Sequence, residues 1–292
     1  MKIQTRAGFL LAAMAATALP LFSQGSSDIY LASLSREGDR LVFAAPVKIS
    51  ERTGYNNQPS FPPDGSGVFY SSADGPQTDI FFYSIGEKTN VRLTSTPDSE
   101  YSPLVMPGGN EFSVIQLVLA EGPRKGAQPL LAFPLQGGPP RLVYEEGKKI
   151  GYHAWIDGDR LAAFVLGEPN TLQLVNLKNG ESRTLADSIG RALYNSPWSS
   201  EEILFSREGI IKKVNITTNA VEDVIALKGG DFFCPTPEGG LLTAAGAEIF
   251  LFQPGRDATW VKVGDFSAFG VTSITRLAVD PQSRWLAFVS NY

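Results

Sequence analysis

A turn-bearing segment recurs six times along this chain, and each copy is followed by short apolar runs. The clearest copy reads Gln58-Pro-Ser-Phe-Pro-Pro-Asp-Gly65. Aligning the copies gives spacings of 44, 51, 43, 38 and 41 residues between Pro59, Pro103, Ala154, Pro197, Pro235 and Arg276. A period of about 40 to 50 residues is typical of β-propellers, in which each repeat forms a four-stranded blade. The repeat therefore predicts an all-β fold, a six-bladed β-propeller of antiparallel blades.

Turns and strands alternate within each copy. Asp, Asn, Ser and Gly supply the turns, as in Asp157-Gly158, because Asp and Asn side chains bond to the nearby backbone and Gly adopts positive φ. The runs that follow, such as Trp285-Leu-Ala-Phe288, are rich in strand-forming residues. Beyond the first two dozen residues no stretch has a sustained helical period. A two-sheet sandwich or a solenoid is the alternative fold.

The last copy is incomplete, because the chain stops at Tyr292 before a third and a fourth strand. Two strands near the other end have no assigned blade, namely Asp28-Ile-Tyr-Leu31 and Arg40-Leu-Val-Phe43. The first of them begins like Asp79-Ile-Phe81, a third strand. Exposed edge strands invite aggregation, so we expect both ends of the chain to complete one composite blade that closes the ring.

The first residues have the pattern of an export signal. Lys2 and Arg6 are followed by an apolar run from Ala7 to Phe22, which is shorter than the roughly 20 residues of a membrane-spanning helix. We expect residues 1–23 to be a cleaved signal peptide, and an uncleaved anchor is the alternative. Residues 24–292 then form one exported domain without an integral membrane span.

Charge and residue counts exclude several classes of function. The formal net charge of −5 disfavours nucleic-acid binding through a basic surface. Cys234 is the only cysteine, so no intramolecular disulfide can form. His153 is the only histidine, so a cluster of histidine metal ligands is excluded, and no Gly-x-Ser-x-Gly elbow is present. These counts favour a non-enzymatic protein without a cofactor.

The repeats resemble those of the TolB-type propellers, a family similar to WD repeats. The family unit reads Pro-Ser-aromatic-Ser-Pro-Asp-Gly, an apolar strand, Asp-Ile-Tyr and Arg-Leu-Thr. The first copy here matches it from Gln58 to Gly65, at Asp79-Ile-Phe81 and at Arg92-Leu-Thr94. TolB itself has an α/β domain before its propeller, and here few residues separate the expected cleavage point from Asp28. The resemblance implies an exported propeller of the bacterial envelope that binds protein segments or other ligands.

Aromatic residues lie two to four positions before the aligned position in five copies. They are Tyr55, Tyr101, Tyr152, Tyr194 and Phe233. This position leads into the innermost strand of a blade, so we expect an aromatic rim at the mouth of the central channel, with the polar partners Asn57, Glu100, His153 and Asn195. Such a rim suits a protein or peptide partner, or a carbohydrate. The alternative is that the rings pack between blades and that His153 is a buried hydrogen-bonding residue.

A calcium-assisted hydrolase or lyase of sugar derivatives is the second functional hypothesis. Calcium prefers oxygen ligands from carboxylates and amides, and propellers that hydrolyse sugar lactones use such a centre. The candidate oxygen ligands at the starts of the blades are those of Asn56, Asn57, Glu100 and Asn195. The alternative for these residues is a role in turns and loops.

Overall fold

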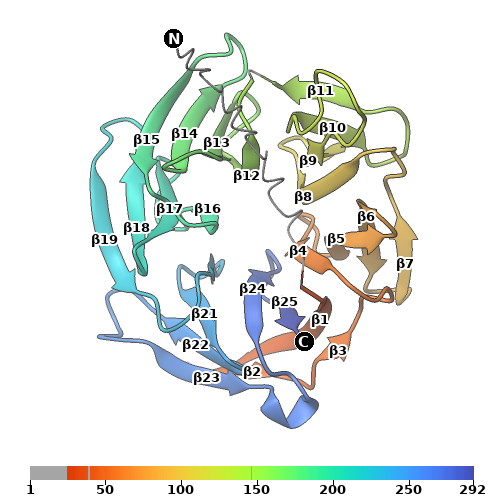
Figure 1. Ribbon diagram of the computed structural model, residues 1–292. Coiled ribbons are helices and arrows are strands. Elements are labelled where there is room, and N and C mark those ends of the chain that lie inside the picture. Colours follow the sequence, from red (N-terminus) through yellow and green to blue (C-terminus); the bar gives the residue numbers. More distant parts are fainter. Residues whose placement is uncertain (1–24, 39, 146) are drawn as a thin grey trace, which may run out of the picture.

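The structure is a computed structural model that describes residues 25–38, 40–145 and 147–292. The expected signal peptide, residues 1–23, lies outside the described residues. Six antiparallel sheets are arranged as blades around a central axis (Figure 1). This arrangement confirms the predicted six-bladed β-propeller.

Five blades are each made of four strands that follow one another along the chain. Blade 1 consists of β4 (Asn56–Ser60), β5 (Gly67–Asp74), β6 (Gln77–Ser84) and β7 (Thr89–Arg92). Blade 2 consists of β8 (Ser99–Val105), β9 (Glu111–Leu117), β10 (Leu130–Pro134) and β11 (Arg141–Tyr144). Blade 3 consists of β12 (Ile150–Trp155), β13 (Arg160–Val165), β14 (Thr171–Asn176) and β15 (Ser182–Asp187).

The remaining two consecutive blades have shorter inner strands. Blade 4 consists of β16 (Leu193–Asn195), β17 (Glu202–Arg207), β18 (Ile210–Asn215) and β19 (Val221–Ala226). Blade 5 consists of β20 (Phe233–Pro235), β21 (Leu241–Ala245), β22 (Glu248–Phe252) and β23 (Val261–Asp265), followed by the short 3-10 helix η1 (Ser267–Phe269). Figure 1 shows β4, β8, β12, β16 and β24 (Ile274–Val279) nearest to the axis.

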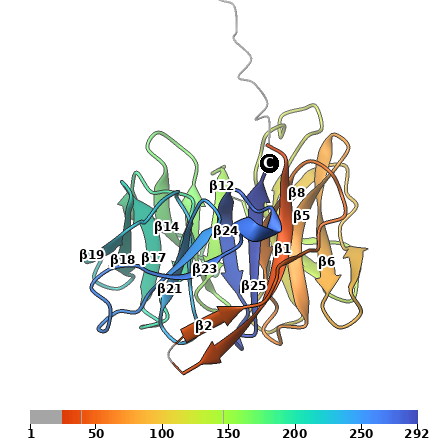
Figure 2. The same ribbon diagram turned by 90° about the horizontal axis from the view of Figure 1, so that it is seen from below.

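The sixth blade is composite, as predicted. It contains β24 and β25 (Trp285–Asn291) from one end of the chain, and β1 (Ser27–Glu37) and β2 (Arg40–Phe43) from the other. β1 pairs with β25 in a seven-residue register from Ser27 opposite Asn291 to Ser33 opposite Trp285. The outer strand is split, because β2 pairs with the second half of β1 and the two-residue β3 (Val47–Lys48) pairs with Tyr30 and Leu31. Figure 2 shows β1 and β25 side by side along the wall of the ring.

The hydrophobic core is divided into six clusters, one between each pair of neighbouring blades. Phe164 of blade 3 and Phe205 of blade 4 share one cluster. Ile29 of the composite blade and Tyr70 of blade 1 share another. Both faces of each blade are therefore covered, which explains why middle strands such as β13 are continuously apolar, here from Leu161 to Val165, rather than alternating.

The turn of the first repeat touches the composite blade. Gly65 has a φ of 64°, as the turn chemistry predicts, and a Cβ atom there would lie 2.2 Å from a guanidinium nitrogen of Arg284. The Arg284 Nη2 donates to the carbonyl of Asp64 at 3.1 Å. Asp280, which is fully buried, accepts from the Arg284 Nε at 3.1 Å and fixes that guanidinium. The Asp64-Gly65 turn therefore connects two strands of blade 1 and also contacts the composite blade.

One strand boundary differs from the sequence prediction. The run Val91-Arg-Leu-Thr94 predicts the fourth strand of blade 1, and the observed strand β7 (Thr89–Arg92) begins and ends two residues earlier. The backbone N–H groups of Leu93 and Thr94 both approach the carbonyl of Ile80, at 2.7 and 3.4 Å. One shared acceptor cannot continue a regular ladder, so the strand ends at Arg92. No helix among the described residues has the length and apolar character needed to cross a bilayer.

Candidate functional site

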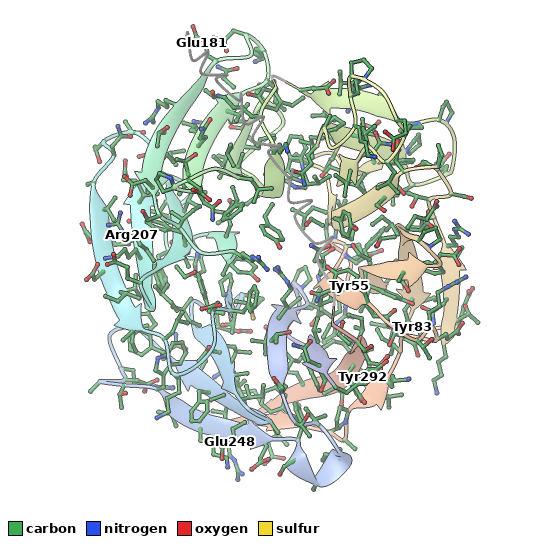
Figure 3. All side chains as sticks on the ribbon, in the orientation of Figure 1. Tyr55, Tyr83, Glu181, Arg207, Glu248 and Tyr292 are labelled. Atoms are coloured by element: carbon green, nitrogen blue, oxygen red, sulfur yellow. The ribbon has the colours of Figure 1, made fainter. Side chains whose placement is uncertain are left out.

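A cavity of about 450 Å³ lies at the end of the channel where the innermost strands begin. Five aromatic side chains line it, namely Tyr55, Tyr101, Tyr152, Phe164 and Phe232. The charged side chains in its lining are Arg191 and Arg276, and no acidic side chain of the described residues belongs to that lining. Figure 3 shows Tyr55 beside the central opening, whereas Glu181, Arg207 and Glu248 lie on the outside of the ring.

A second cavity of about 80 Å³ lies deeper along the channel. It is lined by residues one position further along the same strands, for example His153 after Tyr152 and Leu277 after Arg276. Gln58, Tyr152, Arg191 and Arg276 line both cavities. The two guanidinium groups therefore lie where the wide entrance narrows.

The innermost strands direct these side chains toward the axis by breaking their own ladders. The pairing shifts between Asn57 and Ser60 in β4, between Tyr101 and Leu104 in β8, and between Ile274 and Leu277 in β24. A bulge of this kind bends the strand and changes the direction of a side chain. Gln58 in the first bulge has a φ of 59°. Its Oε1 accepts from the Ser71 hydroxyl and from the Ser102 N–H, both at 2.8 Å, which joins blades 1 and 2 at the cavity wall.

The predicted aromatic rim is divided between two environments. Tyr55, Tyr101 and Tyr152 line the wide cavity, and the rings of Tyr55 and Tyr101 meet edge to face at 6.3 Å. Tyr194 lines the smaller cavity and contacts the Phe233 ring at 5.4 Å. Phe233 is fully buried in the cluster between blades 4 and 5 and lines neither cavity. The alternative of packing between blades thus describes Phe233, and three tyrosines face the wide cavity.

Burial raises the pKa of the Tyr55 phenol above its ordinary value, and the positive charges of Arg276 and Arg191 oppose this shift. The pKa of Tyr194 is raised for the same reason. Both phenols therefore stay protonated at neutral pH and can donate as well as accept hydrogen bonds.

The four predicted polar partners do not converge on the cavity. Asn57 lines it, and its Oδ1 accepts from the Gln58 N–H at 2.8 Å. Asn195 instead donates to the carbonyl of Trp155 at 2.7 Å. His153 is 4% exposed at the wall of the smaller cavity, with its Nε2 2.7 Å from the Ser113 hydroxyl. Burial lowers the pKa of His153 to about 3, so the imidazole is neutral at physiological pH.

Glu100 is fully buried and lines neither cavity. Its Oε1 accepts a hydrogen bond from the Thr96 hydroxyl, and its Oε2 has no hydrogen-bond partner among the described residues. Burial raises the pKa of this carboxyl to about 7. Glu100 is therefore partly protonated at neutral pH, which reduces the cost of burying it.

Arg276 and Arg191 are the site residues that the aromatic pattern does not reveal. The Arg276 guanidinium lies 4.7 Å from the centre of the Tyr152 ring and 4.3 Å from that of Phe232. Neither arginine forms an ion pair with a described residue. A signal for Arg276 was present, because it occupies the aligned position that holds proline in four other copies. Arg191 lies in the loop before β16, where the repeat offers no alignment.

Solved structures of other proteins share this architecture. A TolB candidate from Agrobacterium tumefaciens superposes with a TM-score of 0.66 and 16% identity, over 92% of this chain and 99% of that chain. The chain has a TolB-type propeller fold. TolB from Acinetobacter baumannii has a TM-score of 0.57 and 14% identity, over 94% of this chain and 66% of that chain. No known sequence family and no curated protein matches the chain in sequence.

A propeller that is described as an enzyme is also similar in structure. A gluconolactonase from Xanthomonas campestris has a TM-score of 0.63 and 11% identity, over 89% of this chain and 95% of that chain. The same fold thus occurs in proteins with unrelated names and roles, and the likeness shows the fold alone.

No carboxylate of the described residues belongs to the lining of either channel cavity. Its charged groups are guanidiniums, and no three His, Cys, Asp or Glu side chains of the described residues come together as a metal site. Of the predicted oxygen ligands, Asn56 is buried and its Oδ1 accepts from the Ser72 hydroxyl at 2.7 Å. The Asn56 amide donates to the carbonyls of Ser27 and Arg52. Calcium binding stays a prediction from the sequence.

Glu100 makes the stability of this propeller depend on pH. Its folded pKa of about 7 exceeds the ordinary 4.5, so the folded state binds more protons between these values, and the free energy of unfolding falls as pH rises through them. We expect Glu100→Gln to remove this loss, with an effect on the order of 3 kcal/mol. Urea denaturation of both proteins at pH 4.5 and 7.5 measures it. The prediction is contradicted if the free energies of unfolding of the unchanged protein and of Glu100→Gln differ by the same amount at both pH values.

Proposed function

We propose that this protein is exported and binds a segment of an envelope or secreted protein at the mouth of its channel, without catalysing a reaction. The observation that carries the proposal is the cavity of about 450 Å³ into which tyrosines from three successive blades project. Cavities of about 300 to 1,000 Å³ with apolar and aromatic walls are typical binding sites. Tyrosine supplies a large rigid contact surface with a polar end, which is why it is frequent in binding hot spots.

The expected cell compartment follows from the leader and from the fold. The pattern of Lys2, Arg6 and the apolar run to Phe22 supports export, and the structural similarity to TolB supports a place in the bacterial envelope. We therefore place the binding site in the periplasm or outside the cell. A carbohydrate ligand is the alternative outcome of the experiment that follows.

We expect Tyr101→Ala combined with Tyr152→Ala to abolish capture of the partner, because the two changes remove neighbouring walls of the cavity. Crosslinking in intact cells, followed by affinity capture and mass spectrometry, measures this. Phe269→Ala is the matched control, because Phe269 is an aromatic side chain that is 50% exposed on η1 and outside both cavities. A protein partner that is captured equally by the double variant contradicts the proposed site. Capture of glycan without protein contradicts the proposed ligand.

A further inference from the structure

The charge of the channel is opposite to that of the whole protein. The chain has 30 acidic and 25 basic residues, yet the two charged side chains that line the wide cavity are both arginines. Other arginines are neutralised by close carboxylates, as Arg92 is by Asp79 at 2.6 Å and Arg141 is by Glu111 at 2.6 Å. Arg191 and Arg276 have no such partner among the described residues. A positive channel in a negative protein would attract an anion.

The contacts of Arg276 hold its guanidinium without neutralising it. The rings of Tyr152 and Phe232 lie 4.7 and 4.3 Å from the guanidinium carbon. Contacts with ring faces use the flat face of a guanidinium and leave the N–H groups at its edge available. Neither the Arg276 nor the Arg191 guanidinium donates a hydrogen bond to a described residue. These N–H groups are therefore available to a ligand, and the geometry of a guanidinium matches a carboxylate in a bidentate pair.

The two arginines lie at the narrow junction of the two cavities, which is called the neck below. The wide cavity of about 450 Å³ and the deeper cavity of about 80 Å³ meet where Arg191 and Arg276 line both. The deeper space is too small for a folded element and has room for a carboxylate with a short aliphatic stem. The wide space, with Tyr55 and Tyr101 in its wall, has room for the ligand residues next to that carboxylate. A chain end or an acidic side chain could reach the neck from the mouth.

We propose that Arg191 and Arg276 bind a carboxylate of the partner peptide at this neck, an inference that rests on the proposed function of the cavity. The carboxylate is either the C-terminal carboxylate of the peptide or the side chain of an Asp or Glu within it. The tyrosines of the wide cavity contact the residues next to that group. Recognition of the charge gives the site its specificity, and the aromatic contacts give most of the contact area.

Three soluble libraries of random hexapeptides test the proposal with the full-length protein. The first has a free C-terminal carboxylate and no Asp or Glu, the second has a C-terminal amide and contains Asp or Glu, and the third has a C-terminal amide and no acidic residue. We expect affinity selection to enrich peptides from the first or the second library and none from the third. Enrichment from the first assigns the carboxylate to a chain end, and enrichment from the second assigns it to a side chain.

Variants then connect the enriched peptides to the two arginines. We expect Arg276→Gln and Arg191→Gln each to weaken binding by about 10- to 100-fold, since a hydrogen bond to a charged group is lost. Arg276→Lys keeps the charge but not the fork-shaped geometry, so an intermediate loss is expected. Arg40→Gln is the matched control, because Arg40 lies on the outer strand β2 and also lacks an ion pair with a described residue. Thermal melts show whether each variant is folded.

Three results overturn the inference. They are equal enrichment of neutral amidated peptides, unchanged affinity of the two glutamine variants, and no enrichment from any library. The proposed function stands after any of these results, provided that the tyrosine double variant still loses capture of its partner. If capture of a protein partner fails as well, the proposed function falls with it. Binding of oligogalacturonate in place of peptides, with the same dependence on Arg276, overturns both in favour of a carbohydrate ligand.

Discussion

Deleting Ile274–Tyr292 should prevent the domain from folding cooperatively. The deletion removes β24 and β25, and with them the strand that pairs with β1 over seven residues. It also removes apolar side chains from two clusters, among them Leu286 and Phe288 on one side and Ala287 and Val289 on the other. Each large side chain lost from a core costs about 2 to 5 kcal/mol, and several such losses exceed a total stability of about 5 to 15 kcal/mol.

Circular dichroism during heating and during urea denaturation measures the effect of the deletion. The control is a circular permutant in which a short Gly-Ser linker joins Tyr292 to Gly25 and the chain is opened at the exposed Gly122. The ends are close enough for this, since the Tyr292 N–H donates to the Ser26 carbonyl at 3.1 Å. We expect the permutant to stay folded, because it keeps every strand of the composite blade. A truncated protein that melts at an unchanged temperature contradicts the role of this blade.

Phe288→Ala should be the most destabilising single change at the ring closure. Phe288 is fully buried, and its ring stacks on Tyr30 of β1 at 5.4 Å and on Phe266 at 5.0 Å. Truncating such a phenylalanine leaves a cavity between the two ends of the chain and costs about 3 to 5 kcal/mol. We expect the midpoint of urea denaturation to fall accordingly, with little change in its slope.

Phe269→Ala is the control for Phe288→Ala, because Phe269 is half exposed and contacts the same Phe266 ring at 6.4 Å. Its cost should be within about 0.5 kcal/mol. If Phe288→Ala does not fold, Phe288→Leu tests the same contact with less volume lost, and we expect a cost below about 1.5 kcal/mol. Equal effects of Phe288→Ala and Phe269→Ala contradict the stacking argument.

The fold could be predicted from the sequence because spacing and turn chemistry are properties of the chain itself. The interval between Pro59 and Pro103 reports the length of a blade, and the unpaired Asp28–Leu31 strand reports the composite closure. Both depend on which residues form strands, and neither depends on how side chains pack. The two-residue error at β7 arose because the shared Ile80 acceptor is a three-dimensional feature.

The candidate site could be predicted only in part, because a bulge interrupts the regular alternation of side-chain direction along a strand. Tyr55, Tyr101 and Tyr152 have the expected blade position and do line the cavity. Phe233 has the same blade position but is buried against blade 4, in the cluster that blades 4 and 5 share. Arg191 lies in a loop between blades, and no spacing rule places its guanidinium beside Arg276 in the channel lining.

The join between β1 and β25 places both ends of the described chain at the entrance to the wide cavity. Gly25 and Asn291 belong to its lining, and Figure 2 shows the C-terminus at the same end of the ring as the starts of β8 and β12. A sequence fused directly to Gly25 or to Tyr292 is thereby tethered next to the site. Short flexible tethers give effective concentrations in the millimolar range, which can strengthen apparent binding by about 10²- to 10⁴-fold. An acidic tag would therefore act as an intramolecular inhibitor, and a neutral tag on a long spacer is the suitable choice for binding studies.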